Sequence, residues 1–382
     1  MPQASELIGT EVAESTITRD DILPIQATDH IEIYTGNAKQ AAYFYRAALG
    51  FEWIAYRGPE TGTREAVSYV LEQNKIRIVL TTALQPSGQI ADHVFRHGDG
   101  VKSIALLVDD ARAAWNETTS RGALSASAPQ LLRDRDGEAY LASICLYGDT
   151  VHTFVERNRY HGAFLPGYVR VPGPDRVARP TGLLHIDHMV GNVGWGEMKR
   201  WVRFYEEVMG FRMFKHFDDK DISTEYSALM SKVMTNSNER IRFPINEPAE
   251  GRRKSQIEEY LDFYHGPGVQ HIAMAAHDIV DTVTKLQAQG MDFLQVPTTY
   301  YEDLTARVGK IDEPLDELAR LGILVDRDDE GYMLQIFSKP VEDRPTLFFE
   351  IIQRKGSRSF GKGNFKALFE AIEREQALRG NL

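Results

Sequence analysis

Two histidines and one glutamate stand inside apolar, strand-like stretches of the second half of the chain. His188 belongs to HIDHMVGN, His271 to GVQHIAM and Glu350 to TLFFEII. An unpaired buried carboxylate is costly, so a glutamate in such a strand is expected to have a cationic partner. Two neutral imidazoles and one carboxylate form a facial triad with open coordination positions, typical of mononuclear non-haem Fe(II) sites, whereas zinc prefers tetrahedral ones. The three residues therefore predict a metal site that favours iron or manganese.

The other histidines are weaker candidates. His185 precedes His188 by three residues, and strand alternation places these two side chains on opposite faces of a sheet. A lone histidine in an apolar strand is also more often a hydrogen-bonded core residue than a ligand. The remaining candidates are expected in loops or at strand ends, in contact with solvent: His152, His161, His265 and His277.

The chain is internally duplicated, and the two copies differ at the candidate ligands. GDGVKSIAL resembles GPGVQHIAM, HIEIYTGN resembles HIDHMVGN, and YLASICLYGDTVHTFVER resembles YMLQIFSKPVEDRPTLFFEIIQR. So many anchors in the same order indicate a repeat. We expect both halves to keep the carboxylate and only the second half to have the imidazoles. The alignment pairs His188 with Ile33, His271 with Ser103 and Glu350 with Glu156.

Each half divides again into two modules of one strand, one helix and three strands. In the first half, strands are predicted at 29–35, 51–57, 66–72, 75–82, 101–108, 123–128, 138–147 and 150–157, with helices at 37–49 and 109–121. The predicted fold class is α+β, with four βαβββ modules paired into two open-barrel domains and a C-terminal helix. In each pair the first strands lie side by side between the closing strands, so inward-facing side chains converge inside a curved sheet.

Composition divides the chain into segments. Residues 1–22 are polar and predicted to be flexible, and residues 23–158 are expected to form an N-terminal non-catalytic domain. Residues 159–182 hold four Pro and four Gly, which is the composition of a linker. Residues 183–382 are expected to form the C-terminal catalytic, iron-binding domain, with an amphipathic tail helix at 364–379.

Charge and hydropathy exclude several partner classes. The formal net charge of −11 argues against a nucleic-acid or anionic-membrane partner, because both require a basic surface. No apolar run approaches the roughly 20 residues of a membrane span. The first residues lack the apolar core of a signal peptide. The single cysteine, Cys145, fits a reducing compartment, so we expect a cytoplasmic location.

The motifs of the second half resemble the 4-hydroxyphenylpyruvate dioxygenase family of the vicinal oxygen chelate superfamily. They are HIDHMVGNV, YSALMSKVM, FPINEPA, KSQIEEYL, GVQHIA, GYMLQIFSKPVEDRPTLFFEIIQR and SFGKGNFKALFEAIEREQ, the last with Ser359 where the family often has Gly. The resemblance implies one Fe(II) per chain, held by His188, His271 and Glu350. It implies conversion of 4-hydroxyphenylpyruvate and O₂ to homogentisate and CO₂, in tyrosine catabolism, by a homodimer or homotetramer.

The resemblance also implies a substrate pocket. Amides and hydroxyls suit a neutral phenol and a chelated 2-oxo acid, because they donate and accept hydrogen bonds without imposing charge. Phenylalanines can hold the aromatic ring. Regular alternation directs Gln270 to the sheet face opposite His271. The implied pocket residues are Ser231, Asn246, Gln256, Gln270, Gln335, Phe337, Phe360 and Phe365.

Three alternatives share parts of this pattern. 4-Hydroxymandelate synthase resembles the chain throughout and takes the same substrate, but such members tend to have a smaller aliphatic residue at the position of Phe365. Metal-free binding proteins of this fold lack the His, His, Glu set. Ring-cleaving extradiol dioxygenases have the triad but lack the PINEP and tail motifs.

Overall fold

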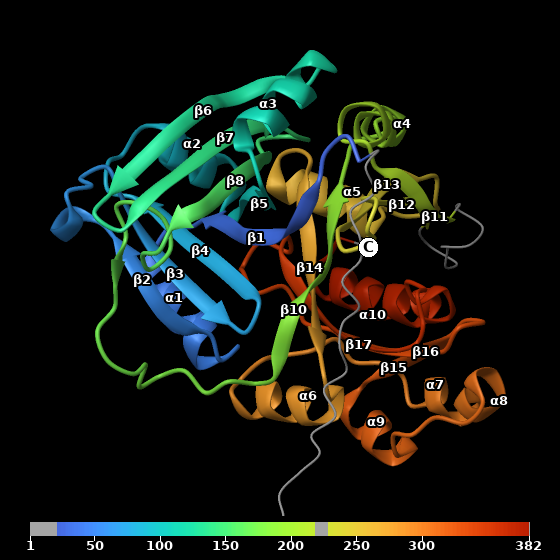
Figure 1. Ribbon diagram of the computed structural model, residues 1–382. Coiled ribbons are helices and arrows are strands. Elements are labelled where there is room, and N and C mark those ends of the chain that lie inside the picture. Colours follow the sequence, from blue (N-terminus) through green and yellow to red (C-terminus); the bar gives the residue numbers. More distant parts are fainter. Residues whose placement is uncertain (1–20, 218–227, 382) are drawn as a thin grey trace, which may run out of the picture.

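The computed structural model describes residues 21–217 and 228–381; residues 1–20 of the predicted flexible N-terminus lie outside this description. Across the described residues, the strands form two curved sheets, one from each half of the chain (Figure 1). Each sheet is built from two βαβββ modules, which confirms the predicted fold class. Every helix in the described ranges is too short or too polar to cross a lipid bilayer.

The first sheet pairs two modules through their first strands. Its first module is β1 (Ile25–Tyr34), α1 (Ala38–Ala47), β2 (Glu52–Arg57), β3 (Ala66–Gln73) and β4 (Ile76–Ala83). After α2 (Gln89–His97), its second module is β5 (Gly100–Val108), α3 (Ala111–Ser120), β6 (Ser125–Asp134), β7 (Gly137–Cys145) and β8 (Val151–Tyr160). The linker contributes β9 (Val169–Arg170), and the order of the strands is β6-β7-β8-β5-β1-β4-β3-β2-β9.

The second sheet repeats this plan. Its first module is β10 (Leu183–Asn192), α4 (Met198–Arg203) with a π-helical turn (Phe204–Val208), β11 (Arg212–Phe217), β12 (Ala228–Thr235) and β13 (Arg242–Ala249). After α5 (Gln256–Tyr264), its second module is β14 (Gly268–Ala276), α6 (Ile279–Ala288), β15 (Leu324–Arg327), β16 (Tyr332–Phe337) and β17 (Phe348–Lys355). The order β11-β12-β13-β10-β14-β17-β16-β15 places β10 and β14 side by side between β13 and β17, as predicted.

Local sequence explains why the module helices begin where they do. Asn37 accepts a hydrogen bond from the backbone N–H of Gln40 at the start of α1. Asp110 and Asp278 cap α3 and α6 in the same way. A side-chain oxygen at this position satisfies a backbone N–H that has no partner within the helix.

Several helices were not predicted. They are α2, α5 and, between α6 and β15, α7 (Thr299–Glu302), α8 (Leu304–Val308) and α9 (Leu315–Leu321). The predicted tail helix is present as α10 (Phe365–Leu378). Its buried stripe includes Leu368, Phe369 and Ile372, and Figure 1 shows the helix lying within the curve of the second sheet.

The strand register corrects the predicted alignment of the halves. Glu32 pairs with Ser103 in the first sheet, whereas Val190 pairs with His271 in the second. Counting back along β1 and β10 from these pairs, the counterpart of His188 is His30. The prediction that His188 replaces Ile33 is therefore wrong. It relied on a shared Gly-Asn dipeptide that lies within β10 but after the end of β1.

The same comparison corrects the counterpart of Glu350. Ala273 pairs with Glu350, and the equivalent Ala105 pairs with Thr153. Glu156 corresponds instead to Gln353, since Glu156 accepts a hydrogen bond from the first N–H of α3 and Gln353 from the first N–H of α6. The predicted common carboxylate is wrong, and the second half alone has Glu at this position.

Candidate metal centre

His188, His271 and Glu350 meet inside the second sheet. They come from β10, β14 and β17, three adjacent strands, and all three side chains are buried. Glu350 Oε2 lies 3.1 Å from His188 Nε2 and 3.4 Å from His271 Nε2. Rigid neighbouring strands thus bring two imidazole nitrogens and one carboxylate oxygen to a single point.

Two β-bulges place a polar residue beside each histidine. Ile186 pairs with Met274 and His188 with Ala273, so Asp187 is an extra residue in β10. Gln270 is likewise extra in β14. A bulge interrupts the alternation of side chains. The expectation that Gln270 points away from His271 is therefore wrong, because the two side chains lie 3.0 Å apart.

These polar neighbours fix which ring nitrogen carries the proton. His188 Nδ1 lies 2.8 Å from Asp187 Oδ1, and His271 Nδ1 lies 3.0 Å from Gln270 Oε1. A carboxylate or an amide oxygen only accepts, so each Nδ1 donates. Both Nε2 atoms are left to face Glu350. An Nδ1–H bonded to an oxygen and an Nε2 directed at the metal is a common arrangement of metal-binding histidine, so this donor set fits a divalent cation.

Asp187 is itself held by arginines. Arg354 donates to both of its carboxylate oxygens, at 2.7 and 2.8 Å, and Arg242 lies 3.7 Å away. Burial by itself raises the pKa of the Asp187 carboxyl, but Arg354 and His188 outweigh burial and hold that pKa well below its ordinary value. Asp187 therefore stays ionised and orients His188.

The pKa values of the triad indicate that Glu350 and His188 form a charged pair and that the His271 ring is neutral. Burial raises the pKa of the Glu350 carboxyl, but the charges and hydrogen bonds of His188 and His271 outweigh burial and lower it to about 2. Burial lowers the pKa of the His188 imidazole, whereas Glu350 and Asp187 together raise it above its ordinary value. At His271 burial dominates and the pKa falls. Without a metal, a proton on His188 neutralises Glu350; a cation would take its place.

A cavity of about 70 Å³ adjoins the triad, with room for several water molecules. Residues from β12, β13, α5, β14, β16 and α10 line it together with the triad. Seven of the eight predicted pocket residues are among them: Ser231, Asn246, Gln256, Gln270, Phe337, Phe360 and Phe365. Gln335 is not. It is buried in β16 and lies against Gly361, where a Cβ would come within 2.6 Å of its amide.

Aromatic rings surround the imidazoles. Phe348 stacks on His271 at 4.8 Å between ring centroids, and Phe360 meets His188 edge-on at 5.1 Å. Phe365, the first residue of α10, meets Phe217 edge-on at 5.2 Å. Aromatic rings therefore surround the metal-binding side chains, and polar groups face them on the amide side of the cavity.

The first half has a related site without the ligand set. His30 occupies the position of His188, contacts Asp29 at 2.7 Å and meets Phe164 edge-on at 5.0 Å. The other two positions hold Ser103 and Thr153, whose hydroxyl oxygens lie 2.7 Å apart.

His152 corrects an expectation. It is fully buried in β8 and its ring contacts the Tyr205 hydroxyl at 2.9 Å, so the prediction that it meets solvent is wrong. His185 is exposed and is not part of the group of side chains that could share a metal with Glu350.

Sequence reasoning missed several residues of the site. Asp187, Arg354 and Phe348 were not singled out, although Asp187 and Phe348 each contact a candidate ligand and Arg354 holds Asp187. The available signal was a polar residue directly before each histidine in a buried strand, which breaks the expected alternation. Other cavity residues that were missed are Val190, Phe217, Leu229, Val233 and Pro244.

Comparison with known proteins shows which family the chain is similar to. A family model described as Glyoxalase/Bleomycin resistance protein/Dioxygenase superfamily matches residues 27–131 and 185–336. The chain is 49% identical over 363 residues to a 4-hydroxyphenylpyruvate dioxygenase from Danio rerio, covering 92% of this chain and 91% of that protein. It is 48% identical over 367 residues to one from Dictyostelium discoideum, covering 94% and 100%. A solved mutant of 4-hydroxymandelate synthase from Streptomyces coelicolor matches with a TM-score of 0.82 at 32% identity, covering 93% of this chain and all of that one.

Proposed function

Since this chain belongs to the 4-hydroxyphenylpyruvate dioxygenase family, within the glyoxalase, bleomycin resistance protein and dioxygenase superfamily, we propose that it converts 4-hydroxyphenylpyruvate and O₂ to homogentisate and CO₂ with one Fe(II) per chain. The observation that carries the proposal is the buried triad of His188, His271 and Glu350. Two imidazoles and one carboxylate are the ligand set of mononuclear Fe(II) oxygenases. In metabolism this is a step of tyrosine catabolism.

The triad residues would hold the iron. When bound there, Fe(II) would supply open coordination positions for the 2-oxo acid and O₂, while oxidation of the substrate, beginning with decarboxylation of its oxo acid, would supply the electrons for reduction of O₂. Asp187 and Gln270 keep the imidazoles oriented, so ligand geometry does not depend on the metal alone. Glu350 stays ionised because both histidines face it.

Polar and aromatic residues would orient the substrate. Ser231, Asn246 and Gln256 offer uncharged hydrogen-bonding groups at the cavity wall, which suit a phenol and an oxo acid. Phe337 and Phe360 offer flat apolar surfaces for the ring. Gln270 donates toward Gln256 at 3.4 Å, which links the metal side of the cavity to the amide side. We propose that Gln335 supports the loop at Gly361 from behind and does not line the cavity.

The tail helix would exclude water. Phe365, Leu368 and Phe369 of α10 form part of the cavity wall. A closed apolar wall strengthens the electrostatic interactions inside and keeps bulk water from reactive species. We infer that α10 must open for the substrate to enter and then close again.

The second candidate is 4-hydroxymandelate synthase, which the structural neighbour favours. Phe365 decides between the two, because its ring reaches into the cavity and limits how far the substrate can tilt. Phe365 supports attack on the ring carbon, and hence homogentisate. A metal-free binding protein of the same fold would have no use for a complete, pre-oriented triad.

We assign the remaining parts of the chain as follows. Residues 23–158 form a non-catalytic domain, supported by Ser103 and Thr153 at two ligand positions; residues 159–182 are the linker, and residues 183–382 form the catalytic domain. The chain acts in the cytoplasm, supported by its single cysteine. It assembles as a homodimer or homotetramer, as the family resemblance implies, which light scattering on the purified protein tests.

The decisive experiment identifies the product. The purified protein is incubated with 4-hydroxyphenylpyruvate, Fe(II) and O₂, and the products are analysed by mass spectrometry. Homogentisate is expected, and Glu350→Gln is expected to abolish its formation while the protein stays folded by circular dichroism. Mainly 4-hydroxymandelate from the wild type would assign the chain to the second candidate instead.

A further inference from the structure

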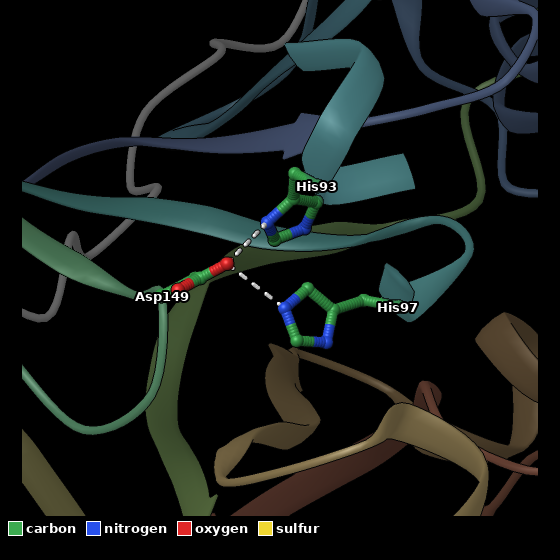
Figure 2. A group of neighbouring side chains, drawn as sticks. All are labelled: His93, His97 and Asp149. Carbon is green, nitrogen blue, oxygen red and sulfur yellow. Dashed lines mark hydrogen bonds and ion pairs between the residues drawn. The ribbon is translucent and has the colours of Figure 1, made fainter. Parts of the chain in front are cut away.

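A second cluster of metal-ligand side chains lies in the first half of the chain. His93 and His97 are four residues apart on α2, so their rings share one face of the helix. Figure 2 shows an oxygen of Asp149, from the turn between β7 and β8, directed at a nitrogen of each ring. Asp149 Oδ2 lies 3.0 Å from His97 Nε2 and 4.0 Å from His93 Nδ1. Both imidazoles are buried and Asp149 is partly exposed, which leaves an entry path for an ion.

The surroundings of His97 direct a lone pair at this carboxylate. His97 Nδ1 makes a short hydrogen bond to the carbonyl oxygen of Tyr264. A carbonyl only accepts, so Nδ1 carries the proton and Nε2 of the neutral ring carries a lone pair. At 3.0 Å this lone pair and the Asp149 oxygen repel each other unless a proton or a metal cation lies between them. The contact therefore requires one or the other.

His93 favours the metal over the proton. The ring is 3% exposed, and neither of its nitrogens has a hydrogen-bond partner among the described residues. Leaving a buried polar atom unpaired destabilises the folded state. Protonation of His97 leaves both nitrogens of His93 unpaired, whereas a cation between the three side chains would take a lone pair from one nitrogen of each ring.

The second half of the chain holds these ligands in place. Gly148, beside Asp149, has a φ of +59°, and a Cβ there would lie 2.2 Å from the carbonyl oxygen of Pro267. Only glycine permits so close an approach of the turn to the second half. Tyr264 fixes His97 from the same side, with its ring stacked on the imidazole at 4.4 Å. The cluster is therefore built into the contact between the two halves.

We propose that His93, His97 and Asp149 bind a divalent cation of the zinc class, which joins α2 and the β7–β8 turn where the two halves meet. Two imidazole nitrogens and one carboxylate oxygen suit Zn²⁺, with a fourth position for water. Ligand atoms around tetrahedral zinc lie about 3.4 Å apart, given bonds of about 2.1 Å. The three ligand atoms here all lie within 4.8 Å of one another. Because such ligands bind Zn²⁺ more tightly than Fe²⁺, the chain keeps one iron.

Two cationic side chains also face Asp149. Arg96 donates to the same Oδ2 at 2.9 Å, and Lys102 donates to the backbone carbonyl of Asp149. The Arg96 side chain is about half exposed, so it can turn into solvent when an ion binds. It competes with the cation for one oxygen, so Arg96→Gln should tighten metal binding.

The test counts metals in the intact enzyme. Iron-loaded protein is dialysed against a small excess of Zn²⁺, and iron plus zinc per chain is measured by mass spectrometry of the elements. The sum is informative because zinc that displaces iron from the triad leaves it unchanged. We expect two metals per chain in the wild type and one in both His93→Gln and Asp149→Asn. We also expect one metal per chain in His271→Ala, because that variant loses the metal of the triad instead.

Affinity and turnover separate this site from the triad. Asp149→Asn should weaken the second Zn²⁺ site at least tenfold, Arg96→Gln should tighten it, and both variants should keep wild-type turnover. A single metal per chain in the wild type would overturn the proposal and leave a protonated His97 as the explanation. A second metal that persists in both His93→Gln and Asp149→Asn would overturn it as well. If these variants fail to fold, an unchanged Zn²⁺ affinity in Arg96→Gln would still count against it.

Discussion

Replacing Asp187 by Asn tests whether its carboxylate positions the metal ligand His188. The carboxylate makes three close polar contacts, at 2.8 Å to His188 Nδ1 and at 2.7 and 2.8 Å to Arg354. The amide of Asn has one accepting oxygen and one donating nitrogen. In at least one of the three contacts, two hydrogen-bond donors then face each other. His188 is then held at best by a neutral, weaker acceptor, and Arg354 loses the charge of the only close carboxylate among the contacts described here.

Two different losses follow. Loss of a group that orients a metal ligand typically costs 10–100-fold in metal affinity, or about 1.4–2.8 kcal/mol. Removing one partner of a buried ion pair costs about 3–5 kcal/mol of folding stability. Asp187 is nearly inaccessible and the Arg354 side chain is 17% exposed, so the lower end of that range is expected.

The first half supplies a matched control. Asp29 contacts His30 at 2.7 Å and Arg157 at 2.9 Å, and Arg77 lies 3.8 Å away, with no triad beside it. Asp29→Asn should therefore cost a similar free energy of unfolding but leave Fe(II) affinity and turnover unchanged. Iron affinity is measured by competition with a chelator, and stability by chemical denaturation of the metal-free protein.

Comparison of the iron affinities of the two variants tests whether Asp187 positions His188. Asp187→Asn should weaken iron binding at least tenfold more than Asp29→Asn does. Equal iron affinities in the two variants would refute the positioning role of Asp187. A loss of stability in Asp187→Asn alone would refute the equivalence of the two carboxylates.

Three further predictions concern the triad and its cavity. Deletion of residues 360–382 should remove the apolar wall of α10, so O₂ consumption measured with an electrode should exceed homogentisate formation; unchanged coupling would count against the helix as a lid. Phe365→Ile should give detectable 4-hydroxymandelate by chromatography, because a change of about 1.4 kcal/mol between competing barriers shifts a product ratio tenfold; identical products would remove Phe365 from the choice of carbon. The metal-free protein should lose stability as pH falls from about 4.3 toward 2. The pKa of Glu350 is lower in the folded state than in the unfolded state, so its ionised form stabilises the fold by roughly 3 kcal/mol above this pH range, and that contribution is lost within it. Glu350→Gln should flatten this part of the denaturation profile.

Much of the fold could be predicted because its signals are local. Alternating and helical apolar patterns identified the strands and module helices of the first half. The internal repeat then indicated two paired sheets. The short helices α7–α9 were missed because each is brief and depends on packing against neighbouring elements, α9 against α6 and α8 against β15, rather than on its own periodicity.

Register could not be predicted. A shared Gly-Asn dipeptide suggested that His188 replaced an isoleucine, but the hydrogen-bonded ladders of the two sheets make His30 its counterpart in the first half. Sequence similarity compares residue types, whereas register depends on which backbone groups bond across strands and on where a bulge adds a residue. The bulges at Asp187 and Gln270 are visible only in that ladder.

By itself the sequence determined the kinds of chemistry available to this protein: two histidines and a glutamate in buried strands, repeated modules to carry them, and a tail helix with one apolar face. Tertiary structure alone decided which atoms meet. It oriented both imidazoles through Asp187 and Gln270, kept Gln335 out of the cavity wall and brought His93, His97 and Asp149 together against the second half. The physical reason is that residue type sets what a side chain can bind, whereas distances between atoms far apart in sequence depend on packing of the whole chain.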